Sequence, residues 1–266
     1  MANGQPANLP QERLPDPSSI LTEFALTPRT RALAPSPAAP PSAAAAPYRI
    51  LRTLEVDEYD PPVAPADIMG LAAPRAAPAA PSDNQFRGTA RKAAKLSIVE
   101  APAQSFSDVR KLIDTLQAHN VMKRHPGLST DRDNNRVDEE RRNVRVTAFL
   151  YAASAEEDND FHLIIGRDPE KSETYMTAEV SGLPPETSAS FEKLKQVRDA
   201  YFEFFADGVP GSSYDFYDPP IPIEIEGSLF FDMSHASGSR PGPSTLRPRM
   251  PVVWEIHPVT DIVFEP

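Results

Sequence analysis

Cysteine is absent from the 266-residue chain, which excludes disulfides, thiolate metal ligands and a cysteine nucleophile. Long apolar runs are also absent, since no window approaches the roughly 18 consecutive apolar residues of a membrane-spanning helix. Met1–Pro10 has neither the basic start nor the apolar stretch of a secretory signal. These absences predict a soluble cytoplasmic protein that does not associate with membranes.

An excess of positive charge is missing too. The net charge is −11, and acidic residues outnumber basic ones from Lys95 onward. A protein that binds mainly through phosphate groups needs clustered Lys and Arg side chains that release counterions. We therefore expect a protein or a small ligand as the partner, rather than duplex nucleic acid.

Common catalytic motifs are absent as well. The sequence has no Gly-x-Ser-x-Gly nucleophile turn, no His-Glu-x-x-His motif, no phosphate-binding glycine loop and no dinucleotide fingerprint. Paired acids occur between Glu156 and Asp160, but they fall in a predicted hairpin turn, where runs of charge are usually hydrated. The motifs therefore assign no catalytic residue.

Proline, by contrast, is abundant near the start of the chain. Of the 31 prolines, 16 precede residue 85, and Ala34–Pro47 consists of Ala, Pro and Ser alone. Such a segment has no apolar face to bury, so residues 1–90 are predicted to be a disordered arm. Tyr48–Val56 is a β-prone island within it, either an edge strand or an exposed apolar patch in a disordered tail. A further possibility is that the island is a docking motif, which would make the arm the functional part.

Residues 91–140 are predicted to hold a helix and a charged linker. Ser105-Phe-Ser-Asp108 fits a capping box, and the helix it starts is expected to end before Pro126. The apolar residues at helical spacing are Val109, Leu112, Ile113 and Leu116.

Residues 141–266 are predicted to form the folded domain. Alternating or apolar runs bounded by turn residues mark five strands, near 144–151, 161–165, 174–180, 221–231 and 252–256. An amphipathic helix from Phe191 to Phe205 separates the third strand from the fourth, and Gly227 is expected to form a bulge.

This order predicts a mainly β protein with helices, of the α+β class. Five strands with a helix between the third and fourth are the pattern of the OB fold, a small, partly open Greek-key barrel. The alternative is a mixed α+β sheet with one helix on its face.

Four short motifs in this domain carry a resemblance. They are Asp158-Asn-Asp-Phe-His162, Ala178-Glu179, Phe230-Phe-Asp-Met-Ser-His235 and Trp254-Glu-Ile-His-Pro-Val259. Residues 144–264 look like a group of small uncharacterised bacterial proteins that share such motifs. That group has no assigned reaction, so the resemblance implies a fold unit and little about function; the chain departs from it in a longer loop after His235.

Strand alternation places four metal-ligating side chains on the outer face of the predicted barrel. They are His162, Glu179, Glu255 and His257. Two imidazoles and two carboxylates suit a divalent metal such as zinc. The alternative is a set of cross-strand His/Glu pairs on a solvated sheet.

The same face is predicted to offer a ligand-binding surface. Phe149, Tyr151 and Tyr175 supply aromatic rings, with Arg145 nearby. OB domains stack bases or sugars on such rings. Two functions follow as hypotheses: a non-catalytic module that binds a ligand or partner, and a metal-dependent hydrolase that uses the outward His and Glu residues.

Overall fold

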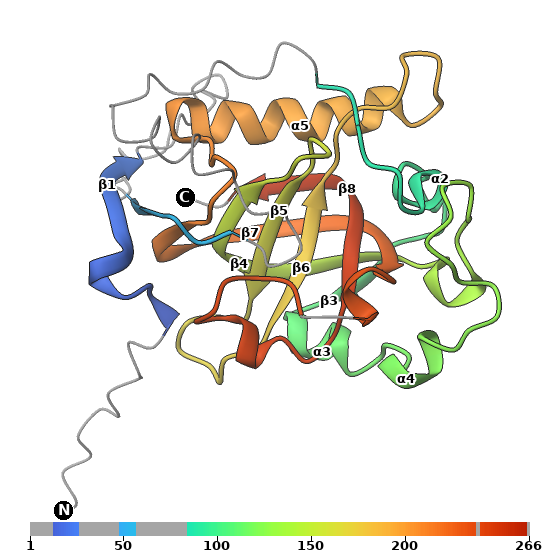
Figure 1. Ribbon diagram of the computed structural model, residues 1–266, viewed down its shortest axis with the longest axis horizontal. Helices are drawn as coiled ribbons and strands as arrows, with labels where there is room; N and C mark the ends of the chain where they lie inside the picture. The colour runs from blue at the N-terminus through green and yellow to red at the C-terminus, as the bar shows by residue number, and fades with distance from the viewer. Residues whose placement is uncertain (1–12, 27–47, 57–83, 238–239, 265–266) are drawn as a thin grey trace, which may run out of the picture.

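The computed structural model describes residues 13–26, 48–56, 84–237 and 240–264, and their strands form one eight-stranded sheet. The strand order is β1-β2-β7-β8-β6-β5-β4-β3, with a further pairing between β7 and β4. Several short helices and one long helix, α5, lie around the sheet (Figure 1). The predicted α+β class, mainly β, is confirmed.

Six of the strands precede the long helix along the chain and two follow it. The strand bounds are β1 Ile20–Leu26, β2 Tyr48–Thr53, β3 Gln104–Phe106, β4 Asn143–Ala155, β5 Phe161–Gly166, β6 Tyr175–Val180, β7 Asp215–Phe231 and β8 Trp254–Phe264.

Five strands form a closed cycle of pairings. β4 pairs with β5, β5 with β6, β6 with β8, β8 with β7, and β7 returns to β4. All these pairs are antiparallel except β6 with β8, which is parallel. The β7–β8 register shifts on both sides of Gly227, where the sequence predicts a bulge. The two strands approach closely there, since a Cβ at this position would lie 2.4 Å from the Pro258 carbonyl oxygen.

The helix α5, Phe191–Phe205, connects β6 with β7 and lies across one end of the sheet (Figure 1). Its apolar stripe enters the main core, where Tyr201 stacks on Phe161 with ring centroids 4.7 Å apart. Phe204 stacks on Phe264 of β8 at 3.9 Å. These contacts fix the helix against the ends of β5 and β8.

The N-terminal segments differ from the predicted disordered arm at three places, 13–26, 48–56 and 84–90. β2 pairs with both β1 and β7, so Tyr48–Thr53 is an inner strand rather than an edge strand, and β1 forms the edge. Tyr48, Ile50 and Leu51 are buried, and this gain in apolar contacts offsets the cost of ordering the segment. Much of the predicted arm, including 27–47, lies outside the described residues.

The predicted helix after Ser105 is shorter than expected. Ser105 lies in β3, which pairs in parallel with β4, and Asp108 is the N-cap of α3, Val109–Ile113. The Asp108 carboxylate accepts hydrogen bonds from the backbone N–H groups of Arg110 and Lys111. Leu116 lies beyond the end of α3 but still packs on the core. Its helical spacing from Leu112 and Ile113 therefore makes the predicted helix longer than the observed one.

Two more short α-helices lie in this region. They are α2, Lys92–Lys95, and α4, His119–Met122. Val109, Leu112 and Met122 are buried in the main core, so residues predicted as a helix and charged linker pack directly on the sheet.

Candidate metal centre

The four predicted metal ligands lie close together on neighbouring strands. His162 of β5 is directly opposite Glu179 of β6, and the parallel register of β6 with β8 brings Glu255 and His257 to the same place. The Nδ1 atom of His257 lies 2.6 Å from Glu179 Oε2 and 3.7 Å from Glu255 Oε2. Sequence alternation thus predicts this group of side chains.

These side chains are buried rather than solvated. The residues are at most 3% exposed, so the alternative of His/Glu pairs on a solvated sheet does not describe them. Residues 84–97 cover this face of the sheet. The Phe86 N–H donates to the Leu183 carbonyl at 2.9 Å, and the Leu183 N–H donates to the Asn84 carbonyl at 2.6 Å. The Arg87 N–H donates to the Asp158 carbonyl at 2.9 Å. A Cβ on Gly182 would lie 2.8 Å from Phe86 Cα, so the covering segment approaches the sheet closely.

Lys95 of α2 projects from this covering segment toward carboxylates. Its Nζ lies 3.5 Å from Asp158 Oδ2, 3.8 Å from Glu179 Oε2 and 4.0 Å from Asp160 Oδ2. Burial opposes the charge on Lys95, but these carboxylates outweigh it and hold the lysine pKa well above its ordinary value. Lys95 is therefore positively charged and lies among these carboxylates.

Further acidic and imidazole groups join the four predicted residues. We call the whole set the acidic cluster. It comprises the carboxylates of Glu156, Asp158, Asp160, Glu179, Asp232 and Glu255 and the imidazoles of His162, His235 and His257.

Glu156 and Asp160 lie in the hairpin turn between β4 and β5, as the sequence predicts, but their carboxylates are largely buried rather than hydrated. Asp160 is fully buried beneath the covering segment. Its Oδ1 accepts a hydrogen bond from the Gly182 N–H at 2.6 Å. One signal was available, since Asp160 and Asp232 sit beside strand ends in the same short motifs as His162 and His235.

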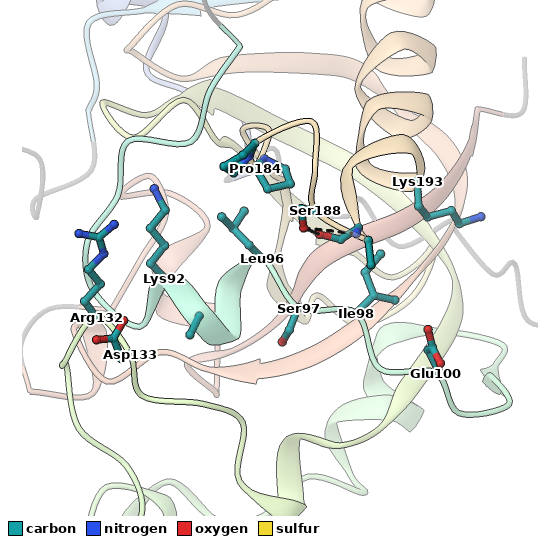
Figure 2. Close-up of a pocket in the computed structure, with 14 residues that line it drawn as sticks. Lys92, Leu96, Ser97, Ile98, Glu100, Arg132, Asp133, Pro184, Ser188 and Lys193 are labelled. Carbon is teal, nitrogen blue, oxygen red and sulfur yellow. Dashed lines mark hydrogen bonds between the residues drawn. The ribbon is translucent and has the colours of Figure 1, made fainter.

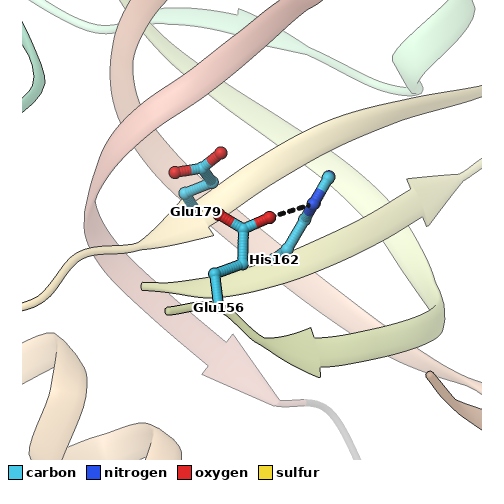
Figure 3. A group of neighbouring side chains, drawn as sticks. All are labelled: Glu156, His162 and Glu179. Carbon is cyan, nitrogen blue, oxygen red and sulfur yellow. Dashed lines mark hydrogen bonds and ion pairs between the residues drawn. The ribbon is translucent and has the colours of Figure 1, made fainter. Parts of the chain in front are cut away.

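Glu156 and His162 form a pair at the edge of the cluster (Figure 3). Glu156 follows β4, and its Oε1 lies 2.7 Å from His162 Nδ1, with Glu179 behind them on β6. The Glu156 side chain is 16% exposed, whereas that of His162 is fully buried. Burial raises the pKa of Glu156 to about 7, with the nearby charge of Glu179 adding to the shift. A carboxyl group of this kind exchanges protons near neutral pH.

The buried carboxylates respond to one another's charge. Burial, with the charges of Asp158 and Glu179, raises the pKa of Asp160 well above its ordinary value. Burial and the charge of Glu179 raise the pKa of Glu255 in the same way. Burial also opposes ionisation of Glu179, but positive charge nearby holds its pKa well below the ordinary range. His257, which contacts Glu179, makes the largest contribution to this lowering, and Lys95 adds to it. Burial lowers the pKa of His257 itself.

Several buried oxygens in the cluster have no hydrogen-bond partner among the described residues. They include both carboxylate oxygens of Glu255 and Oδ2 of Asp160. A buried polar atom without a partner costs about 1–3 kcal/mol, and buried polar groups in proteins are normally paired. The fold therefore leaves ligand atoms directed into the cluster without a protein donor.

Residues outside the cluster contact His257 and fix its position. Ser181 Oγ lies 3.0 Å from its Nε2, and the Phe230 ring contacts the imidazole with centroids 5.4 Å apart. The backbone carbonyl of His257 accepts a hydrogen bond from Arg136 at 2.6 Å. Such contacts orient a metal-ligating imidazole.

Three groups of side chains each place their ligand atoms within 4.8 Å of one another. They are Glu156–His162–Glu179, Asp160–Glu179–His257 and Asp232–His235–Glu255. Glu179 belongs to the first two groups. The second contains only buried residues, which makes it the innermost position for a cation.

The predicted ligand-binding surface is not exposed. Tyr151 and Tyr175 are buried in a second apolar cluster and contact each other edge to face at 4.8 Å. Leu246 and Met250 of the long loop after β7 belong to the same cluster and help to enclose the rings. The sequence pattern cannot show this, because the loop that closes over the rings carries no strand period.

The other two residues of the predicted surface differ from each other in their contacts. Phe149 is partly buried against the second apolar cluster. Arg145 binds Glu226 across the β4–β7 pair, with Nη2 2.5 Å from Oε2.

A separate pocket of about 710 Å³ lies on another side of α2 (Figure 2). Lys92, Leu96, Arg132 and Lys193 are among its lining residues, whereas none of the predicted site residues lines it. Glu100 and Asp133 place acidic groups among these cations. The pocket therefore differs in character from the acidic cluster.

No protein-family model, curated protein or solved structure matches the chain. None of the described helices has the length and apolar character needed to cross a membrane.

Proposed function

We propose that this protein is a metal-dependent hydrolase whose centre lies on the outer face of an OB-like barrel. The observation that carries the proposal is the buried acidic cluster, in which neither carboxylate oxygen of Glu255 has a hydrogen-bond donor among the described residues. The resemblance of its motifs to a group of small bacterial proteins supplies no reaction, so the chemistry rests on the geometry.

The closed cycle of five pairings supports the OB-like assignment. In the OB pattern, the first strand pairs with the second and fourth, and the third strand runs parallel to the fifth. β4, β5, β6, β7 and β8 have these relations, and α5 occupies the connection between the third and fourth of them. The three remaining strands extend the sheet outside the cycle.

The excess of negative charge in the acidic cluster supports a bound cation. Six carboxylates are grouped in the cluster, while Lys95 contributes one positive charge. Carboxylates that lose their water require a nearby cation or a proton. In the absence of a metal, the raised pKa values of Asp160 and Glu255 indicate that protons take this role.

Donor chemistry narrows the choice of metal. Carboxylate oxygens together with imidazole nitrogens, and no thiolate, suit zinc, manganese or ferrous iron better than copper(I). Asp160, Glu179 and His257 form the innermost ligand group.

A divalent metal in such a site supplies Lewis acidity, which polarises a carbonyl or phosphoryl oxygen and makes water a better nucleophile. The chain's own contribution is proton transfer by Glu156, which is partly exposed and paired with His162. The pKa of Glu156 near 7 suits a general acid or base.

Metal content of the tag-free full-length protein tests the proposal. After incubation with Zn²⁺ or Mn²⁺ and removal of free metal, we expect near-stoichiometric bound metal by elemental analysis. Glu179→Gln and His257→Ala are expected to lose that metal, whereas Glu224→Gln, on the exposed part of β7, retains it. A wild-type protein that binds neither metal would contradict the proposal.

Hydrolysis is then measured with chromogenic carboxylic and phosphate esters. The metal-loaded wild type is expected to hydrolyse one class, and a chelator to abolish the activity. Glu156→Gln is expected to keep metal bound by Asp160, Glu179 and His257 and to lose about 100-fold or more in rate. Metal binding without hydrolysis of either class would leave a metal-binding protein and remove the catalytic part of the proposal.

The other hypothesis, a non-catalytic module that binds a protein or small ligand, remains a prediction. Burial of Tyr151 and Tyr175 removes the aromatic surface on which it depended.

A further inference from the structure

A second ligand group adjoins the innermost one. Asp232 follows β7, His235 begins a short helix, His235–Ser237, and Glu255 lies on β8. One ligand atom from each of them lies within 4.8 Å of the other two. The Asp232 and His235 side chains are 10% and 11% exposed, and that of Glu255 is fully buried.

The local chain conformation positions Asp232 and His235 together. The Asp232 N–H donates to the Val253 carbonyl at 3.2 Å, which ties the end of β7 to the segment before β8. Asp232 Oδ1 accepts the Ser234 N–H at 2.7 Å, and its Oδ2 contacts His235 Nδ1. The turn therefore holds a carboxylate and an imidazole on one side before any ligand arrives.

Glu255 connects this group with the innermost one. Its Oε2 lies 3.7 Å from His257 Nδ1 in the innermost group, while the same residue belongs to the group with Asp232 and His235. Neither of its oxygens has a hydrogen-bond partner among the described residues. A carboxylate between two ligand groups, whose oxygens accept no hydrogen bond, has the form of a bridging ligand.

Charge favours two cations over one. One divalent ion together with Lys95 offsets half of the six carboxylates of the cluster, whereas two divalent ions with Lys95 leave one carboxylate uncompensated. Burial makes each uncompensated charge costly.

We propose that the protein binds two divalent metal ions, the first at Asp160, Glu179 and His257 and the second at Asp232, His235 and Glu255, with Glu255 between them. The inference rests on the proposed function at the first position. A pair of ions can stabilise both the attacking and the leaving oxygen of a displacement, as in two-metal phosphatases and aminopeptidases. The second ion thus adds a template for the leaving group.

Stoichiometry with Mn²⁺ alone tests this proposal in the full-length, tag-free protein. We expect two Mn²⁺ per chain in the wild type and one in His235→Ala. Asp232→Asn, which preserves the side-chain shape, is a second variant and is also expected to bind one. His125→Ala is the matched control, because His125 pairs with Glu139 outside the cluster.

Electron paramagnetic resonance provides an independent measurement. Two neighbouring Mn²⁺ ions give a spin-coupled spectrum, which is expected in the wild type and in His125→Ala and lost in His235→Ala. One uncoupled Mn²⁺ per wild-type chain would overturn the second site and leave the first intact. No bound Mn²⁺ or Zn²⁺ in the wild type would overturn both.

Discussion

Two buried groups of charged residues lie on neighbouring parts of this fold and differ in how their charges are compensated. In the first, Arg91 donates to both oxygens of Glu140, at 2.7 and 2.8 Å, and to the Phe231 carbonyl. The same carboxylate accepts backbone N–H groups from Val137 and Phe231. Each charged group in this network thus has several partners.

The acidic cluster has the opposite character. Its carboxylates outnumber the nearby lysine, and Glu255 lacks a hydrogen-bond partner among the described residues. The balanced network fixes the covering segment, since Arg91 directly precedes α2 and Arg136 binds the carbonyls of Ala94 and Ser97. One group therefore positions a structural element, and the other retains unsatisfied atoms suited to a ligand.

The largest expected effect is in the balanced network. Glu140→Gln leaves Arg91 buried without its carboxylate partner, and we expect the free energy of unfolding to fall by about 3–5 kcal/mol. Urea denaturation followed by circular dichroism measures this change. Glu203→Gln, on the exposed side of α5, serves as the control and is expected to change it by less than about 0.5 kcal/mol. Equal stabilities of the two variants would show that charge balance does not hold this network.

An intermediate effect is expected at Lys95. Lys95→Met removes a positive charge within 4.0 Å of Asp160 and Glu179, which are ligands of the proposed first metal. We expect Mn²⁺ affinity to rise at least about tenfold, because the lysine and the metal compete for the same carboxylates. Isothermal titration calorimetry measures the affinity.

The metal-free form of Lys95→Met is expected to lose about 1–3 kcal/mol of stability, since its carboxylates lose a charged partner. Lys195→Met, at a partly exposed position on α5, is the matched control. Weaker Mn²⁺ binding in Lys95→Met would mean that the lysine supports the metal site instead of competing with it.

The sequence predicts the five central strands and α5 because alternation and helical spacing report local burial directly. The same alternation predicts that His162, Glu179, Glu255 and His257 share a face. The place of Lys95 in the cluster could not be predicted in this way, since it depends on the Arg91–Glu140 contact between residues far apart in the sequence. No local period encodes such a contact.

Short or exposed elements also escape sequence analysis. β3 has three residues, none of them buried, which is too short for a two-residue period to be recognised. β1 is an edge strand with one buried residue, Leu26, so its sequence carries little of the alternation that marks a core strand. Residues that cover Tyr151 and Tyr175 lie in loops, and the prediction of an exposed aromatic face failed for that reason.

The smallest expected effect distinguishes the two candidate caps of α3. Asp108→Ala removes the acceptor for two backbone N–H groups and the contact with Arg167, so we expect a loss of about 1 kcal/mol in the free energy of unfolding. Ser105→Ala, in β3, is the control and is expected to change little. A larger loss for Ser105→Ala would restore the capping box that the sequence suggested.

The pH dependence of the stability of Asp108→Ala extends the comparison to the Asp108 carboxylate, which has its hydrogen-bond and charged partners in place. Burial opposes ionisation of Asp108, but the Lys111 N–H and the Arg167 charge outweigh it and lower the pKa of the carboxyl group. A folded-state pKa below the unfolded value gives stability that is present at neutral pH and lost as the pH falls through the folded-state pKa. The stability difference between wild type and Asp108→Ala should therefore be largest near about pH 7 and shrink toward about pH 3 in urea denaturation. A difference independent of pH would mean that Asp108 acts through its shape and not through its charge.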